Sequence, residues 1–258
     1  MGNNMNTYQL WLEEAAVIAE RASQVALSFF RQTLLIEVKE NGTPVTNADK
    51  KTEEFIRAEL TKSFPEHGIL GEEFGEQRAD SDFVWTIDPI DGTRSFMRGI
   101  PLFGTLLALI HKGDPVIGIM VLPALNETYL ASKGMGTFCN GSRLHVSATK
   151  SLENAFVSSG DVSCFEAIGK SNYQKALMEK ADVARGYTDC FSHAMVMRGA
   201  LDAMIDPVVS PWDVAPLACL IEEAGGQYFT FEGEKTHLGT SFLTAATPEL
   251  KKELLVLK

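Results

Sequence analysis

The chain contains 258 residues, of which 45% are hydrophobic, and carries a formal net charge of −11 at pH 7. A chain of this length can bury a substantial core, in one large domain or in two modest ones. The acidic balance argues against a protein that binds the phosphate backbone of nucleic acids, because such binding needs a basic surface that displaces counterions. We therefore expect no nucleic-acid partner.

The sequence gives no signal for export or for membrane insertion. The N-terminal stretch MGNNMNTYQLWLEEA lacks a basic segment leading into an apolar one, and no apolar run approaches the length that spans a bilayer. The cysteines are widely separated, which fits a reducing compartment and buried thiols. They are Cys139, Cys164, Cys190 and Cys219. We expect a cytoplasmic protein with no membrane partner.

Helices are predicted first along the chain, and antiparallel strands follow them. Apolar residues recur at helical spacing from Tyr8 to about Phe30, which predicts an amphipathic helix packed on a larger body. A second helix is predicted from Lys51 to about Ser63. From Gly104 to Val146, apolar runs such as TLLALI and VIGIMVL are joined by Gly-containing turns. This pattern predicts β-hairpins.

Strands and helices are predicted to alternate in the remainder of the chain. The segments AFVSSG, DVARGY and ALDAMID are typical of strands, whereas FSHAMVMRG and the stretch from Pro211 to Ala224 are typical of helices. The pattern predicts a mixed α/β (α+β) protein with two halves, residues 1–148 and 149–258, that meet near residues 146–151.

Two pairs of acidic residues follow predicted strands. Glu72 and Glu73 lie in GILGEEFG, and Asp88 and Asp91 end the strand FVWTI. Strand ends are where α/β proteins present ligands. The stretch DPIDG also fits a surface turn. Two ionised carboxylates about 4 Å apart repel by roughly 4 kcal/mol near a protein surface, however, and a bound cation removes that cost. Oxygen ligands without a Cys or His cluster favour Mg²⁺.

The residues around these carboxylates allow more than one interpretation. Gly92 and Thr93 precede a predicted short helix, where backbone N–H groups can meet a phosphate. Asp213 fits either a metal ligand or a capping box with Ser210. Asp49, in PVTNAD, could simply cap the helix that follows it.

Taken together, these motifs resemble the inositol monophosphatase family of magnesium-dependent, lithium-sensitive phosphatases. The matching strings PVTNAD, GEE, WTIDPIDGT, PWDVAPL and EEAGG occur in order across nearly the whole chain. The resemblance implies a layered α/β/α/β/α sandwich of the type that inositol monophosphatase shares with fructose-1,6-bisphosphatase. It also implies a homodimer, with the active site between the two halves.

The resemblance further implies two to three Mg²⁺ ions per site and inhibition by Li⁺. Glu72, Asp88 and the carbonyl of Ile90 would hold one ion, and Asp88, Asp91 and Asp213 a second. A third, weaker ion would be supported by Glu72, with Asp49 in an outer shell.

The catalytic residues that the resemblance implies are Glu72, Thr93 and Asp49. Thr93 and Glu72 would orient the water that attacks phosphorus, and Glu73 and Lys39 would support the site. The five histidines (His67, His111, His145, His193 and His237) lie in unrelated contexts. We expect them to be structural or exposed to solvent.

Two stretches bear on the substrate. DGTRSF and GYTDCFSHA depart from the DGTTNF-like and GTAAL-like strings of inositol phosphatases and resemble those of histidinol-phosphate phosphatases in the same superfamily. Asp189, helped by Asp206, would pair with the ammonium group of histidinol, and Arg94 lies in the other departing stretch. The alternatives are that Asp189 caps a helix beginning near Phe191 and that Arg94 covers apolar surface.

Three functions follow as hypotheses. The first is an L-histidinol-phosphate phosphatase of histidine biosynthesis, with a small-molecule phosphate ester as substrate, which Gly92, Thr93, Arg94, Asp189 and Asp206 would bind. The second is an inositol-1-monophosphatase or a broad sugar-phosphate phosphatase. The third is a partner protein of the transcription or RNA machinery, as some family members are, and the intact metal motifs weigh against it.

Overall fold

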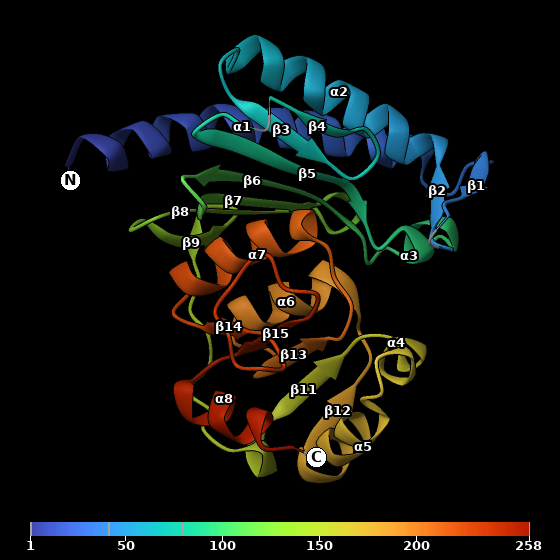
Figure 1. Ribbon diagram of the computed structural model, residues 1–258, viewed down its shortest axis with the longest axis vertical. Coiled ribbons are helices and arrows are strands. Elements are labelled where there is room, and N and C mark those ends of the chain that lie inside the picture. Colours follow the sequence, from blue (N-terminus) through green and yellow to red (C-terminus); the bar gives the residue numbers. More distant parts are fainter. Residues whose placement is uncertain (1, 41, 79, 258) are drawn as a thin grey trace.

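The computed structural model describes residues 2–40, 42–78 and 80–257. Its elements stack as layers in the order helices, sheet, helices, sheet, helices (Figure 1). The α/β/α/β/α sandwich expected from the sequence is therefore confirmed. In the described part of the chain, no helix combines the length and the apolar character needed to cross a membrane.

The first layer consists of the long helices α1 (Gly2–Phe29) and α2 (Asn47–Ser63), which cover the outer face of the larger sheet (Figure 1). Leu12, Ile56 and Trp85 contribute to the core between them. Within the described residues this sheet has eight strands, in the order β10-β9-β8-β7-β6-β5-β3-β4. They are β3 (Gly68–Gly71), β4 (Gly75–Gln77), β5 (Phe83–Asp91), β6 (Gly104–His111), β7 (Asp114–Leu122), β8 (Glu127–Ser132), β9 (Gly136–Cys139) and β10 (Ser142–Arg143).

Helix α2 begins at Asn47, earlier than the predicted start at Lys51. The reason is a capping box at Thr46, the last residue of a hairpin formed by β1 (Ile36–Val38) and β2 (Pro44–Thr46). The Thr46 hydroxyl accepts a hydrogen bond from the Ala48 N–H at 3.1 Å, and Asp49 Oδ2 accepts one from the Thr46 N–H at 2.8 Å. These bonds satisfy N–H groups that a helix start leaves without partners.

The middle layer consists of α6 (Asp189–Met197) and α7 (Pro211–Glu223), which lie between the two sheets (Figure 1). Its core joins Leu106 of the larger sheet to Phe242 of the smaller one. Helix α7 packs so closely on β7 that a Cβ atom at Gly118 would lie 2.5 Å from the carbonyl oxygen of Pro216. The middle of α7 is thereby held against the larger sheet.

The smaller sheet has five strands among the described residues, in the order β12-β11-β13-β15-β14. The three predicted strands form β11 (Phe156–Ser159), β12 (Val183–Arg185) and β13 (Ala203–Asp206). Strands β14 (Gln227–Phe229) and β15 (Phe242–Ala245) were not predicted. The remaining elements are α3 (Thr93–Met97), η1 (Pro123–Leu125), η2 (Leu152–Asn154), α4 (Val162–Ala167), α5 (Ser171–Lys180) and α8 (Pro248–Leu255). The division into residues 1–148 and 149–258 stays a prediction.

Candidate active site

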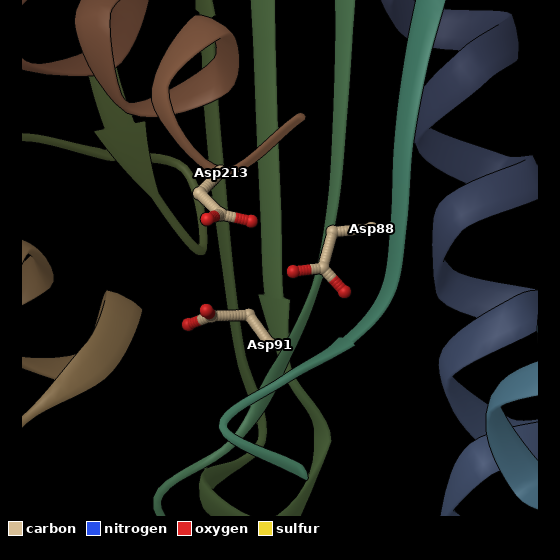
Figure 2. A group of neighbouring side chains, drawn as sticks. All are labelled: Asp88, Asp91 and Asp213. Carbon is tan, nitrogen blue, oxygen red and sulfur yellow. The ribbon is translucent and has the colours of Figure 1, made fainter. Parts of the chain in front are cut away.

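Three carboxylates meet where β5 ends and α7 begins. One oxygen from each of Asp88, Asp91 and Asp213 lies within 4.8 Å of the others, and Figure 2 shows the three side chains around one space. In a regular strand, side chains three residues apart point to opposite faces. Here β5 is irregular, because Asp88 pairs with Leu106 and Asp91 with Gly104. The extra residue on β5 acts as a β-bulge and lets both aspartates face α7.

Ionising the carboxylates of this cluster is energetically unfavourable. Asp88 is only 2% exposed. Burial, together with the charge of Glu72, raises the pKa of Asp88 well above the usual range. Burial, and then neighbouring carboxylates, raise the pKa values of Asp91 and Asp213 to about 7. A hard divalent cation fits this donor set, because it takes carboxylate oxygens and removes their repulsion.

Each of these carboxylates is oriented by a backbone N–H group. Asp88 Oδ1 accepts from Ile90 at 3.0 Å, and Asp91 Oδ2 accepts from Cys190 at 2.6 Å. Asp213 Oδ2 accepts from the Ser210 N–H at 2.8 Å as part of a capping box. The capping role predicted for Asp213 is therefore present, and it is compatible with a ligand role because the second carboxylate oxygen stays available.

The GEE turn follows β3 and is tied to the β1–β2 hairpin. Lys39 Nζ lies 2.8 Å from Glu72 Oε1 and 2.8 Å from Glu73 Oε1. The metal-ligand group found among the described residues does not include Glu72. Its charge nevertheless raises the pKa of Asp88 and of Asp213. Glu72 therefore lies near the cluster, while its carboxylate pairs with a lysine.

Thr93 links the cluster to α2. Its hydroxyl group lies 3.2 Å from Asp49 Oδ1 and 3.0 Å from the Ile90 carbonyl oxygen, and it can donate its proton to either. Asp49 is buried, and its other oxygen accepts from the backbone N–H of Thr46. The predicted cap at Asp49 is thus present, and the same carboxylate also orients Thr93.

Glu53, which the sequence patterns did not single out, fixes the backbone of the GEE turn. This side chain of α2 is fully buried and accepts hydrogen bonds from the N–H groups of Glu73 at 2.7 Å and Phe74 at 3.2 Å. Arg57 donates to it at 2.7 Å. A Cβ atom at Gly71 would lie 2.0 Å from Glu53 Oε1, so this position needs glycine. An acidic residue on the buried stripe of α2 is the signal that could have identified it.

Replacing Glu53 with Ala is expected to lower the free energy of unfolding by about 3 kcal/mol or more, because it leaves Nε of Arg57 and two backbone N–H groups without their acceptor. Urea unfolding measures this change. Glu54→Ala is the matched control, since Glu54 lies on the exposed face and pairs with Lys51. That control should cost less than about 1 kcal/mol. Equal stability of the two variants would contradict an anchoring role for Glu53.

A cavity of about 100 Å³ adjoins the carboxylate cluster. It is lined by Asp91 and Asp213, by the two predicted substrate residues Asp189 and Asp206, and by apolar side chains that include Phe242. Burial, and then the charges of Asp91 and Asp206, raise the pKa of Asp189 well above its usual range. Burial raises the pKa of Asp206 to about 7. A cation in this cavity would lower the electrostatic cost of ionising these carboxylates.

Asp189 does not act as the helix cap that the sequence allowed. Helix α6 begins at Asp189 itself, and in the described structure its N-cap, Thr188, makes no side-chain capping bond. Both residues have positive φ angles, 36° at Thr188 and 55° at Asp189, which L-residues rarely adopt. The Asp189 carboxylate approaches Gly92, where a Cβ atom would lie 3.2 Å from its Oδ2. Arg94 lies exposed on α3.

Most of the predicted thiol and histidine environments agree with the structure. Cys139, Cys190 and Cys219 are buried, Cys164 is partly buried, and the described residues include no disulfide. His193 is also buried, and its Nε2 lies 3.0 Å from Oδ2 of Asp206, a predicted substrate residue.

The layered fold is that of a solved inositol monophosphatase, and the acidic site could hold a metal ion. A model of the inositol monophosphatase family matches residues 8–257, so the chain belongs to the inositol monophosphatase family. It is a phosphoric monoester hydrolase. Members of this family are generally metal-dependent, and the acidic cluster could bind a metal ion.

Individual relatives carry more than one name. A histidinol-phosphatase of Chlorobaculum parvum is 36% identical over 95% of this chain and 95% of that protein. An inositol-1-monophosphatase of Mesorhizobium japonicum is 32% identical over 87% of this chain and 86% of that protein. The solved structure of an inositol monophosphatase from Zymomonas mobilis matches with a TM-score of 0.87 and 30% identity, covering 96% of this chain and 97% of that one.

Proposed function

We propose that the protein is a Mg²⁺-dependent L-histidinol-phosphate phosphatase. The observation that carries this proposal is the pair Asp189 and Asp206, which line one cavity together with Asp91 and Asp213. An inositol phosphate has no positive charge to place beside two additional carboxylates. The phosphate ester of an amino alcohol brings an ammonium group, which balances them.

The proposed metal ligands are the carboxylates of Asp88, Asp91, Asp213 and Glu72 and the carbonyl of Ile90. When bound, two to three Mg²⁺ ions would neutralise the phosphate oxygens and make water a stronger nucleophile. Inhibition by Li⁺ is expected for the same site. Asp49 would lie in an outer shell, since its carboxylate is held by Thr46 and by Thr93.

The protein's own groups would position the water and the ester. Because the Thr93 hydroxyl directs its proton to Asp49 or to Ile90, its lone pairs are left to accept a hydrogen bond from a water. In this proposal Thr93 and Glu72 orient that water, while the backbone of Gly92 and Thr93 meets the phosphate. Hydrolysis forms a bond from the water oxygen to phosphorus and breaks the bond to the alcohol oxygen, which takes up a proton.

Two neighbouring groups would support this arrangement. Lys39 holds Glu72 and Glu73 together, which fixes the direction of the Glu72 carboxylate. Arg94 is proposed to lie at the substrate entrance. We also infer that the protein is cytoplasmic and forms a homodimer. Sedimentation of the purified protein would test the homodimer.

The proposal is tested by phosphate release from L-histidinol phosphate and from inositol 1-phosphate, measured in parallel with Mg²⁺. The expected kcat/KM is at least about 30-fold higher for histidinol phosphate, since a desolvated charge pair is worth about 2–5 kcal/mol. EDTA is expected to stop both reactions. Equal values for the two esters would favour the broader inositol or sugar-phosphate phosphatase, a function that the Mesorhizobium japonicum relative's name supports.

A further inference from the structure

His193 lies immediately behind the cavity and does not line it. Its side chain has no solvent exposure, and Asp206, which does line the cavity, keeps 17% of its side chain exposed. His193 comes from α6, whereas Asp206 ends β13. The contact between His193 Nε2 and Asp206 Oδ2, at 3.0 Å, therefore joins the middle helix layer to a carboxylate that lines the cavity.

The other ring nitrogen of His193 is also held. Nδ1 lies 3.1 Å from the hydroxyl of Thr244 on β15, and the ring packs 5.0 Å from the ring of Phe242, measured between centroids. When Asp206 is ionised it can only accept hydrogen bonds, so in that state Nε2 of His193 carries the proton and donates to Asp206. Nδ1 then accepts from the Thr244 hydroxyl. In that state the three side chains form one chain of hydrogen bonds that runs from Thr244 through His193 to Asp206.

The protonation of the ring agrees with this direction. Burial lowers the pKa of His193 to about 3, so the imidazole is neutral at physiological pH and carries a single N–H group. A neutral imidazole orients Asp206 without cancelling its negative charge. The carboxylate is thus fixed in place, and a cationic group in the cavity would favour its ionised form, because burial raises the pKa of Asp206 to about 7.

The opposite side of Asp206 is also constrained. A Cβ atom at Gly160 would lie 2.6 Å from Asp206 Oδ1, a separation that real Cβ atoms do not show. Glycine at this position, which follows β11, leaves room for that oxygen beside the backbone. Asp206 is consequently held between a hydrogen-bond donor at Oδ2 and the chain at Oδ1. A carboxylate that rotated freely would bind the substrate more weakly, because a preorganised group loses less entropy on binding.

From this geometry we infer that His193 is a positioning residue for substrate recognition: with Thr244 it holds Asp206 in the orientation that receives the ammonium group of the ester. The inference rests on the proposed function, because it requires a cationic substrate. His193 touches neither the substrate nor the reacting atoms. Its effect should therefore appear in KM for the cationic ester and should depend on the presence of Asp206.

The test compares His193→Leu with the wild type on L-histidinol phosphate and on glycerol 2-phosphate, a neutral alcohol ester. His193→Leu is expected to raise KM for histidinol phosphate about 10-fold or more and to raise KM for glycerol 2-phosphate by a smaller factor. His193→Gln keeps an N–H donor and should therefore have a KM for histidinol phosphate close to that of the wild type. His67→Leu, the same substitution in the aromatic cluster beside Trp85, is the matched control and should leave the ratio of the two KM values unchanged.

Two further readouts separate positioning from a general loss of structure. In an Asp206→Asn background, His193→Leu should change KM for histidinol phosphate by less than about 2-fold, because the group through which it acts has lost its charge. In the wild type, ¹⁵N chemical shifts of His193 should show a protonated Nε2 and an unprotonated Nδ1. The opposite tautomer would overturn the inference.

The possible failures can be told apart. A wild type that hydrolyses histidinol phosphate no better than glycerol 2-phosphate would overturn the proposed function, and this inference with it. A wild type that prefers histidinol phosphate, together with a His193→Leu variant that keeps the same preference, would overturn the inference alone. An equal loss on both esters would also overturn it, because a purely structural role predicts that result.

Discussion

Replacing Asp88 with Asn is expected to reduce phosphate release from every ester by about a thousandfold or more. Asp88 belongs to the carboxylate cluster, is 2% exposed, and is proposed to be a ligand of two metal ions. Losing a shared ligand removes several kcal/mol of charge stabilisation in the transition state. Steady-state rates at saturating Mg²⁺ measure the loss. Asp82→Asn, at an exposed position just before β5, is the matched control and should keep wild-type rates.

At high pH, the metal-free Asp88→Asn protein should be more stable than the metal-free wild type. Because the folded-state pKa of Asp88 is raised, its contribution to stability is complete below the ordinary carboxyl pKa and is lost as pH rises through the raised value. Asp91 and Asp213, with pKa values of about 7, titrate in the same direction. In EDTA, wild-type stability should therefore fall between about pH 4 and pH 8.

Asn cannot ionise, so Asp88→Asn should lose less stability over this range, and Mg²⁺ should raise its Tm less than that of the wild type. Thermal unfolding at pH 5 and pH 8, with and without Mg²⁺, checks both effects. An Asp88→Asn protein with full activity would contradict the metal assignment. A wild type whose metal-free Tm does not change with pH would contradict the electrostatic account of the cluster.

The sequence identified the members of the cluster but not how they come together. Asp88 and Asp91 could be recognised from their motif, yet the alternation of a regular strand would have placed them on opposite faces. The bulge that brings them together depends on the pairing of β5 with β6, which is a long-range contact. Asp213 was identified with two possible roles, and the structure allows both because capping uses one carboxylate oxygen.

Residues that act through other residues were harder to predict. Glu53 lies on a helix where acidic residues are usually exposed, and its role is visible only once the GEE turn is placed against α2. His193 was expected to be structural or exposed to solvent. It is buried, and its contact with Asp206 was not foreseen. Helix and strand patterns specify which face is apolar. They do not specify which buried polar groups meet across two layers.

A second large effect is expected at Asp189. Asp189→Asn should lower kcat/KM for L-histidinol phosphate by at least about 30-fold, because removing one partner of a desolvated charge pair costs about 2–5 kcal/mol. The loss on glycerol 2-phosphate should be much smaller, since that ester offers no ammonium group. Parallel kinetics on the two esters measure the difference.

Asn is a better test than Ala at this position. The φ angle of Asp189 is 55°, a conformation that Asn tolerates well and that Ala adopts only with strain. Asp189→Ala would therefore combine a lost charge with a distorted start of α6. Asn keeps the shape and the hydrogen-bonding capacity toward Thr188, so a change in substrate preference can be assigned to the charge.

Asp161→Asn provides the matched control, because Asp161 is exposed and its charge reaches both Asp189 and Asp206. An exposed carboxylate is worth less than about 1 kcal/mol to an ion pair, so this variant should lose no more than about 5-fold on histidinol phosphate. If Asp189→Asn lowers kcat/KM for the two esters by the same factor, the cavity does not select for a cation. If Asp161→Asn instead produces the larger selective loss, the ammonium group binds at the rim, outside the cavity that Asp189 lines.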